Sequence, residues 1–254
     1  MDPYAWTPDA ETLVLVPLLL LGYGVSLRFH PASRGRVAAF LAGQALILGA
    51  FLTPLETLSL HYLLSAHLLQ NVVLAEWAPA LAVLGLPPSL AAAIGRVPGM
   101  RALTHPLVAL PIWLGTSFAW HLPWAYDTAL EHSSSLLHVE HGCYFAAGVL
   151  LWWPVVHERP RRLSSGAKAG YLFGAFVLAS PLGLLLALLP SPVYSFYERA
   201  PRLWGLDALA DQQLAGVTMA AEQAVVFFAV FAVFLLRFFE EEERAERRQA
   251  AATR

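Results

Sequence analysis

Seven long apolar stretches, separated by short polar or proline-rich breaks, constrain the fold of this chain more than any other feature. An α-helix rises 1.5 Å per residue, so it needs about 20 mainly apolar residues to cross roughly 30 Å of hydrocarbon. The candidate stretches are residues 12–28, 35–54, 61–85, 105–122, 135–156, 167–189 and 212–237. They predict an all-α polytopic membrane protein, with one seven-helix transmembrane domain over residues 1–237 and a charged tail over residues 238–254.

Composition supports the same fold class. Hydrophobic residues make up 57% of the 254 residues and charged residues only 13%, whereas a soluble domain carries about 25% charged residues. The formal net charge of −2 and the lack of a basic stripe argue against a nucleic-acid partner. Cys143 is the single cysteine, which excludes an intramolecular disulfide and a metal site built on a pair of cysteines.

The basic residues predict the orientation, because cytoplasmic loops of membrane proteins collect Lys and Arg. With seven spans, 14 of the 16 basic residues fall on one side of the membrane. They are Arg28, Arg34, Arg36, Arg96, Arg101, Arg159, Arg161, Arg162, Lys168, Arg237, Arg244, Arg247, Arg248 and Arg254. The sequence therefore predicts a bacterial plasma-membrane protein with its N-terminus outside and its C-terminus, including a helical tail, in the cytoplasm.

This topology places an unusual set of polar residues at the outer end of four helices. Ionisable residues are costly in hydrocarbon and usually face the interior of the bundle or a functional cavity. His138 and His141 are three residues apart, so they share one helical face and could bind one metal. The full set of candidate metal ligands is His67, His121, His138, His141, Asp211 and Met219.

The donor types leave the metal open. Imidazole together with thioether suits copper, and the thioether favours Cu(I). Neutral imidazoles also suit zinc, which accepts a carboxylate more readily. His61 and His132, near or in loops, are expected to be ordinary polar residues at the membrane surface. Among the other carboxylates, Glu140 could orient a ligand on another helix, and Glu76 could be either a proton relay or a neutral hydrogen-bonded carboxyl.

Three sequence blocks resemble the CtaG family, the membrane-embedded assembly factors of caa-type cytochrome c oxidases. The blocks are "SAHLLQNVVLAEWAPALAVLGLP", "WHLPWAYDTALEHSSSLLHVEHGCYFAAGVLLWWPVV" and "LADQQLAGVTM", in that order along the chain. The resemblance covers about residues 55 to 236. The six candidate ligands match the family's recurrent polar residues by position. One departure is Asn71, which stands where the family usually has the second histidine of a His-x-x-x-His motif.

The resemblance implies an assembly factor, a metallochaperone that binds copper in the outer leaflet. Its partner is then a cytochrome c oxidase subunit, and its task is to assist maturation of the copper centre in the oxidase large subunit. A donor site buried in the membrane could pass Cu(I) sideways by ligand exchange. No pair of a nucleophile and a base is visible in the sequence, so we expect no enzymatic turnover.

Other functions fit the same residues. A seven-helix zinc hydrolase could hold the metal through His67, His138, His141 and Asp211, with Ser65 nearby, and would activate a bound water. A haem-binding redox protein would use two axial histidines from facing helices. A docking factor would use the polar cluster to bind the oxidase without any metal. The sequence leaves the oligomeric state open, including a homo-oligomer.

Overall fold

The structure, a computed structural model, describes residues 2–132 and 134–252. It is a bundle of roughly parallel and antiparallel helices. The helices are α1 (Ala10–Phe29), α2 (Arg34–Phe51), α3 (Pro54–His61), α4 (Leu64–Val72), the π-helical turn η1 (Val73–Trp77), α5 (Ala78–Gly85), α6 (Pro88–Ile94), α7 (Met100–Leu103), α8 (Pro106–Trp120), α9 (Pro123–His132), α10 (Ser134–Val156), α11 (Ser165–Leu188), α12 (Ser195–Arg199) and α13 (Ala208–Ala252). The described residues contain no β-strand, which confirms the all-α prediction.

Four helical segments are long and apolar enough to cross a membrane: α1, the continuous segment Leu64–Gly85, α11 and α13. The pair α2 and α3 makes a fifth candidate, bent by 53°. α8 is apolar but shorter, and α10 has its apolar run interrupted by His138, Glu140 and His141. The count of seven spans and the orientation of the two ends stay predictions.

The boundary predicted at residue 54 is wrong, because the helix that begins at Arg34 ends at Phe51. Pro54 disfavours helical geometry at the residue before it. The chain therefore turns, and Thr53 caps a new helix, α3, through a hydrogen bond to the Leu55 amide. The predicted helix over residues 61–85 likewise starts only at Leu64, so His61 belongs to α3.

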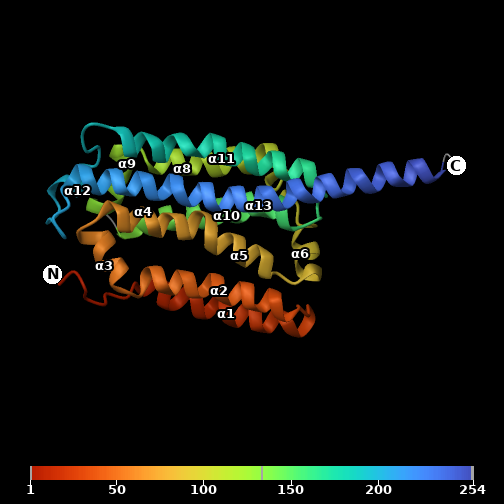
Figure 1. Cartoon of the computed structure of the whole chain (residues 1–254). Helices are drawn as coiled ribbons and strands as arrows, with labels where there is room; N and C mark the ends of the chain where they lie inside the picture. Colours follow the sequence, from red (N-terminus) through yellow and green to blue (C-terminus); the bar gives the residue numbers. More distant parts are fainter. Residues whose placement is uncertain (1, 133, 253–254) are drawn as a thin grey trace.

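The short helices α6, α7, α9 and α12 lie between the seven apolar stretches, in segments for which no helix was predicted. The charged tail is helical as predicted, since α13 continues to Ala252. Ion pairs between residues four apart, Arg244 with Glu240 and Arg247 with Glu243, support this exposed extension. It projects from the bundle at the end opposite the N-terminus (Figure 1).

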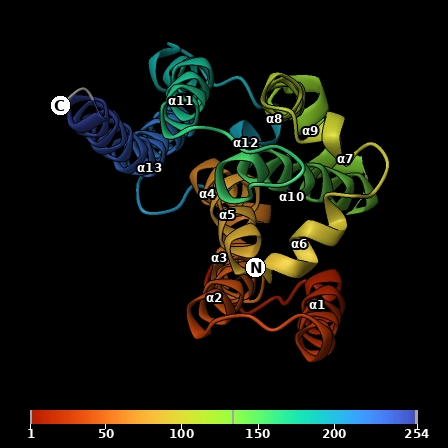
Figure 2. The same cartoon turned by 90° about the vertical axis from the view of Figure 1, so that its right-hand side faces the viewer.

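The segment α4–η1–α5 and helix α10 lie at the centre of the bundle (Figure 2). α1 and α2 pack on one side of them, α11 and α13 on another, and α8 and α9 on a third. A core of Trp113, Leu151, Leu172 and Phe227 joins α8, α10, α11 and α13. Several polar side chains on these two central elements, among them His67, Asn71 and Glu140, are therefore buried between helices.

Candidate metal centre

His67 lies on α4 and is 1% exposed. The hydroxyl of Tyr197 donates its proton to the carbonyl oxygen of Ser59 at 2.5 Å, since a carbonyl can only accept. The same hydroxyl oxygen lies 3.0 Å from His67 Nδ1 and so accepts the Nδ1 proton. This leaves the lone pair on Nε2. His67 Nε2 is buried and has no hydrogen-bond partner in the described part of the chain.

His121 caps the C-terminus of α8. Like His67, it has its proton on Nδ1 and a free lone pair on Nε2, but through different contacts. Its Nδ1 lies 2.7 Å from the carbonyl oxygen of Ser117 and therefore carries the proton. The Tyr144 hydroxyl lies 3.1 Å from the same nitrogen. His121 Nε2 also has no partner among the residues described, and the side chain is 7% exposed. Two histidines thus have their proton fixed on Nδ1 and an unused lone pair on Nε2.

His141 on α10 is the third member of this group. Its Nε2 is buried without a partner within residues 2–132 and 134–252. The ring centroids of His67 and His141 are 6.3 Å apart. Tyr126 contacts two of the histidines, with its ring centroid 5.1 Å from that of His67 and 6.0 Å from that of His121. We call His67, His121 and His141 the histidine cluster.

The histidine cluster offers unpartnered nitrogen atoms to a metal ion, but its side chains are not arranged as a complete coordination site. Buried polar atoms are nearly always hydrogen-bonded, so three unpartnered Nε2 atoms in one region are unusual. Two imidazoles that bind one ion from opposite sides have ring centroids about 6 Å apart, given a nitrogen–metal distance of about 2.0 Å. Nevertheless, no three His, Cys, Asp or Glu side chains that the structure describes are close enough to hold a metal together.

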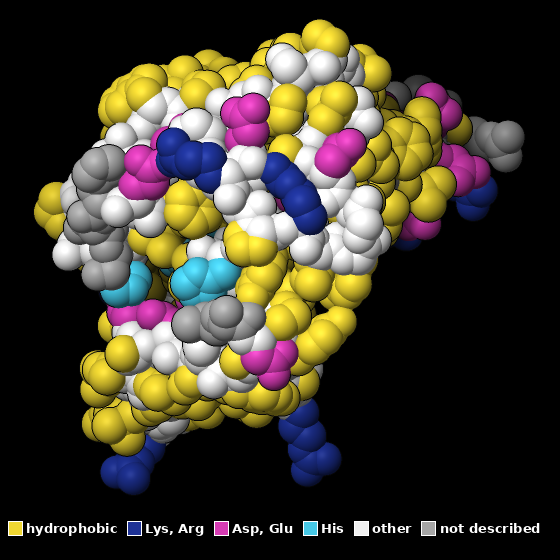
Figure 3. Space-filling view, turned by 90° about the vertical axis from the view of Figure 1, so that its left-hand side faces the viewer, with side chains coloured by type: hydrophobic (Ala, Val, Ile, Leu, Met, Phe, Trp, Pro, Cys, Tyr) yellow, Lys and Arg dark blue, Asp and Glu magenta, His cyan; other side chains and the backbone are white. Residues whose placement is uncertain are grey.

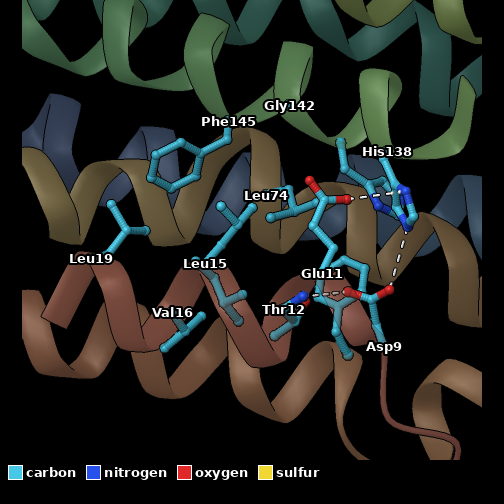
Figure 4. Close-up of a pocket in the computed structure, with 13 residues that line it drawn as sticks. Asp9, Glu11, Thr12, Leu15, Val16, Leu19, Leu74, His138, Gly142 and Phe145 are labelled. Carbon is cyan, nitrogen blue, oxygen red and sulfur yellow. Dashed lines mark hydrogen bonds and ion pairs between the residues drawn. The ribbon is translucent and has the colours of Figure 1, made fainter. Parts of the chain in front are cut away.

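His138 has contacts that the histidine cluster lacks. Its Nε2 is 3.4 Å from Asp9 Oδ1 and its Nδ1 is 3.2 Å from Glu11 Oε2 (Figure 4). These three side chains stand at the polar part of a pocket of about 160 Å³ that is otherwise mainly apolar. His141 lines the same pocket. The expectation that His138 and His141 would share one ion stays a prediction, and here His138 is paired with carboxylates of the N-terminal segment.

The carboxyl of Asp9 is held in its charged form. Burial acts to raise the pKa of Asp9, but hydrogen bonds from the backbone and side chain of Thr12 and the nearby His138 outweigh it, so the pKa lies below its ordinary value. One of these bonds, from the Thr12 amide at 2.6 Å, caps α1. The pocket therefore carries negative charge at the end of the molecule where histidine side chains surround a hollow (Figure 3).

Asp211 has a structural role. One carboxylate oxygen accepts from the Leu64 amide at 2.6 Å, and the other accepts from the Ser65 amide at 3.2 Å and the Ser65 hydroxyl at 2.5 Å. These bonds satisfy backbone donors at the N-terminus of α4, where no residue of α4 itself provides a cap. Asp211 therefore fixes the start of the helix that carries His67, and its assignment as a ligand stays a prediction.

Met219 and Asn71 lie beside His121 rather than beside His138. All three line a small cavity of about 20 Å³. The Asn71 amide nitrogen lies 3.4 Å from Glu140 Oε1, so Glu140 orients this amide and not a histidine. Met219 is 6% exposed, and the thioether stays a predicted ligand. His61 is exposed at the end of α3, outside the histidine cluster, and the side chain of His132 lies outside the described residues.

The residues that orient the imidazoles of His67 and His121 are not among those predicted from the sequence. Tyr197 reaches His67 because Asp127 on α9 accepts hydrogen bonds from the Ser195 hydroxyl at 2.8 Å and the Phe196 amide at 3.1 Å, and so holds α12 in place. The two residues of the Tyr197–His67 contact are 130 positions apart. An isolated tyrosine in a loop gives no signal of such a role. Tyr126 and Tyr144, which lie inside one of the quoted blocks, could have been singled out.

Comparison with known proteins places the chain in a family. Two curated relatives, uncharacterized proteins of Mycobacterium bovis and Mycobacterium tuberculosis, are each 25% identical over 72% of this chain and 31% of their own length. An uncharacterized protein of Mycobacterium leprae is 23% identical over 88% of this chain and 38% of its own length. The chain thus spans about a third of the length of these relatives. No solved structure matches.

The family match covers most of the chain. Residues 14–241 match the family described as cytochrome c oxidase caa3 assembly factor, Caa3_CtaG. The matched range contains every candidate ligand and all three members of the histidine cluster. It also agrees with the resemblance found in the three sequence blocks. The chain belongs to the caa3 cytochrome c oxidase assembly factor family.

Proposed function

We propose that this chain binds Cu(I) at the histidine cluster and delivers it to a cytochrome c oxidase subunit during assembly of the copper centre. The observation that carries the proposal is the state of His67 and His121, whose Nδ1 protons are committed to oxygen acceptors while both Nε2 lone pairs are buried and unused. A neutral imidazole with its other nitrogen hydrogen-bonded is the form that binds metals.

The donor set favours copper over zinc. The candidate donors outside the carboxylates are imidazoles and the Met219 thioether, which suit Cu(I). Zinc sites commonly use four ligands, and the carboxylate that would best complete one, Asp211, is engaged in capping α4. The 6.3 Å separation of the His67 and His141 rings fits an ion held between two imidazoles, with few other bonds to break on transfer.

The proposal includes a route for the ion. Asp9, Glu11 and His138 would attract a cation to the mouth of the 160 Å³ pocket, and His141 of the histidine cluster lines that same pocket. Passage from His138 to His141 would therefore be a ligand exchange between two imidazoles one helical turn apart. Carboxylates serve here as electrostatic attraction, because they are poor ligands for a soft ion.

The proposed setting is a bacterial plasma membrane crossed seven times, with the histidine cluster in the outer leaflet. The basic residues support this orientation, since Arg28 and Arg34 flank the turn between α1 and α2 at the end of the bundle opposite the N-terminus (Figure 1). The cluster lies toward the other end, near α3 and α12. A site at that depth could face an oxidase subunit directly through the bilayer.

Metal analysis of the protein purified in detergent under reducing conditions with added Cu(I) tests the proposal. We expect about one copper per chain in the wild type and loss of copper in the His67→Ala/His141→Ala variant. The matched control is His61→Ala, which removes an exposed histidine at the same end of the molecule and should retain copper.

Three other results would contradict the proposal. Zinc in the wild type, with hydrolase activity, would support a zinc enzyme. A Soret band after supplementation with haem would support a haem protein. Background metal in every form, with loss of oxidase co-purification in the histidine variants, would leave a docking factor without a metal.

A further inference from the structure

A pair of carboxyl groups lies in the interior of the bundle, away from the histidine cluster. Glu76 belongs to η1 and is 2% exposed, and Glu222 belongs to α13 and is half-buried. Gln223 donates to Glu76 Oε1 at 3.0 Å, and Trp77 Nε1 donates to Glu222 Oε2 at 2.7 Å. Two hydrogen bonds therefore join the central segment to α13. They use the adjacent residues Glu76 and Trp77 of the segment and the adjacent residues Glu222 and Gln223 of α13.

The second oxygen of each carboxyl has no assigned partner. Glu76 Oε2, Glu222 Oε1 and the side-chain oxygen of Gln223 are all buried without a hydrogen bond to any residue that the structure describes. Trp77 follows Glu76 and bonds Glu222, while Gln223 follows Glu222 and bonds Glu76, so the two carboxyl groups lie close together. Buried acceptor oxygens without a donor are costly in a low-dielectric interior. A positively charged species, or a proton on one carboxyl, is needed to stabilise this arrangement.

The surrounding groups do not supply that charge. The ion pairs identified in residues 2–132 and 134–252 include neither Glu76 nor Glu222. The titratable groups that face the adjoining cavity from the packed helices are His121 of α8 and Tyr144 of α10. Glu140 of α10 is a further acid nearby, bonded to Asn71. Two ionised carboxylates in contact would repel strongly here.

The geometry points to a proton rather than a metal ion. Ca²⁺ takes about six to eight oxygen ligands, and Mg²⁺ about six in near-octahedral geometry. The two carboxyl groups offer two unbonded oxygens, and they belong to no metal-holding group among the described side chains. A single proton between two carboxyl oxygens satisfies both atoms at once, because one oxygen becomes a donor and the other accepts.

We propose that Glu76 and Glu222 hold one exchangeable proton between them, forming a proton-binding site inside the membrane domain. Two further observations support exchange. Glu76 lies in a π-helical turn, a distortion that recurs at functional sites in α-helices. A small cavity of about 20 Å³ also lies between Ser117, His121, Glu76 and Gln223, which is room for about one water molecule beside the pair. This site does not depend on copper binding.

Carbodiimide labelling of the full chain in detergent tests the proposal. Dicyclohexylcarbodiimide adds to a protonated carboxyl in an apolar environment, and peptide mass spectrometry locates the adduct. We expect labelling of Glu76 or Glu222, at least about tenfold greater near pH 6 than near pH 9, since only the protonated form reacts. The label on these peptides should vanish in Glu76→Gln/Glu222→Gln and persist in Glu140→Gln, which removes the nearby acid outside the pair.

Two results would overturn the proposal. Absence of label on both residues across the pH range would show that neither carboxyl carries an exchangeable proton. Protection from labelling by millimolar Na⁺, Mg²⁺ or Ca²⁺ at constant pH would show that a metal cation occupies the pair. The wild-type measurement decides between them without any variant, so a variant that fails to fold leaves the test intact.

Discussion

The central segment Leu64–Gly85 and the peripheral helix α1 are both apolar enough to span a membrane, yet they differ in where their side chains lie. In the central segment 67% of the most apolar window is buried, against 17% in α1. The buried segment carries His67, Gln70, Asn71 and Glu76, whereas α1 exposes Leu13, Leu18 and Leu21. Lipid solvates an apolar surface at no cost, so the polar residues, not the apolar ones, mark the interior.

The largest effect is expected where the central helices approach most closely. A Cβ on Gly148 of α10 would collide with the carbonyl oxygen of Ala75 and lie 2.6 Å from the ring of Pro79. Gly148→Ala should destabilise the protein by about 2 to 3 kcal/mol, because backbone must move. Gly22→Ala on α1, with nothing within 4 Å, is the matched control. Thermal unfolding in detergent measures the stability of both variants. Equal losses of stability would show that the central segment and α1 do not differ in how tightly they pack.

Removal of the cap on the central segment should cost somewhat less. Asp211→Ala leaves the Leu64 and Ser65 amides without their acceptor, and we expect a loss of about 2 kcal/mol. Thermal unfolding again provides the measurement. Asp211→Asn keeps one acceptor oxygen and should lose less stability while it retains copper. Loss of copper in a stably folded Asp211→Asn protein would instead show that the carboxylate is a ligand.

Loss of an orienting hydroxyl should weaken metal binding more than folding. Tyr197→Phe frees His67 to change its tautomer, and we expect copper affinity to fall about 10-fold or more. Competition with a Cu(I) chelator measures the change. Tyr171→Phe removes another buried hydroxyl, bonded to the Leu151 carbonyl at 3.1 Å, and should leave affinity unchanged. An equal loss in both variants would indicate a general effect of packing.

The smallest expected effect concerns His157, which follows α10, the helix packed against the central segment. Burial, aided by Arg36 and Lys168, lowers the pKa of His157 after α10 from 6.5 to about 4. Between those values the unfolded chain binds more protons, so this histidine makes stability fall as the pH decreases from 6.5 toward 4. We expect a shallower pH dependence of thermal unfolding in His157→Gln than in the wild type.

Much of the fold could be predicted because hydropathy is a local property. Each of the seven apolar stretches contains helix, and the exposed tail is helical as expected. The bend before Pro54 and the late start at Leu64 were missed. Their cause is capping geometry at single residues, which a window of about 20 residues averages away.

The candidate site was predictable in composition but not in arrangement. The His67 ring lies 6.3 Å from that of His141, and Tyr126 contacts both His67 and His121, whereas His138 pairs with Asp9 and Glu11. Spacing along α10 placed His138 and His141 on one face. It could not show that the N-terminal segment would supply two carboxylates at that face, because those contacts join residues more than a hundred positions apart.

The amino-acid sequence alone predicts an all-helical membrane protein of this family. That property follows from side-chain transfer energies summed along each helix. Three features required the tertiary structure: the free nitrogen of His67 and His121, the cap that Asp211 provides for α4, and the approach of Glu76 to Glu222. These depend on single hydrogen-bond partners brought from distant segments, and a hydrogen bond acts only within about 3 Å.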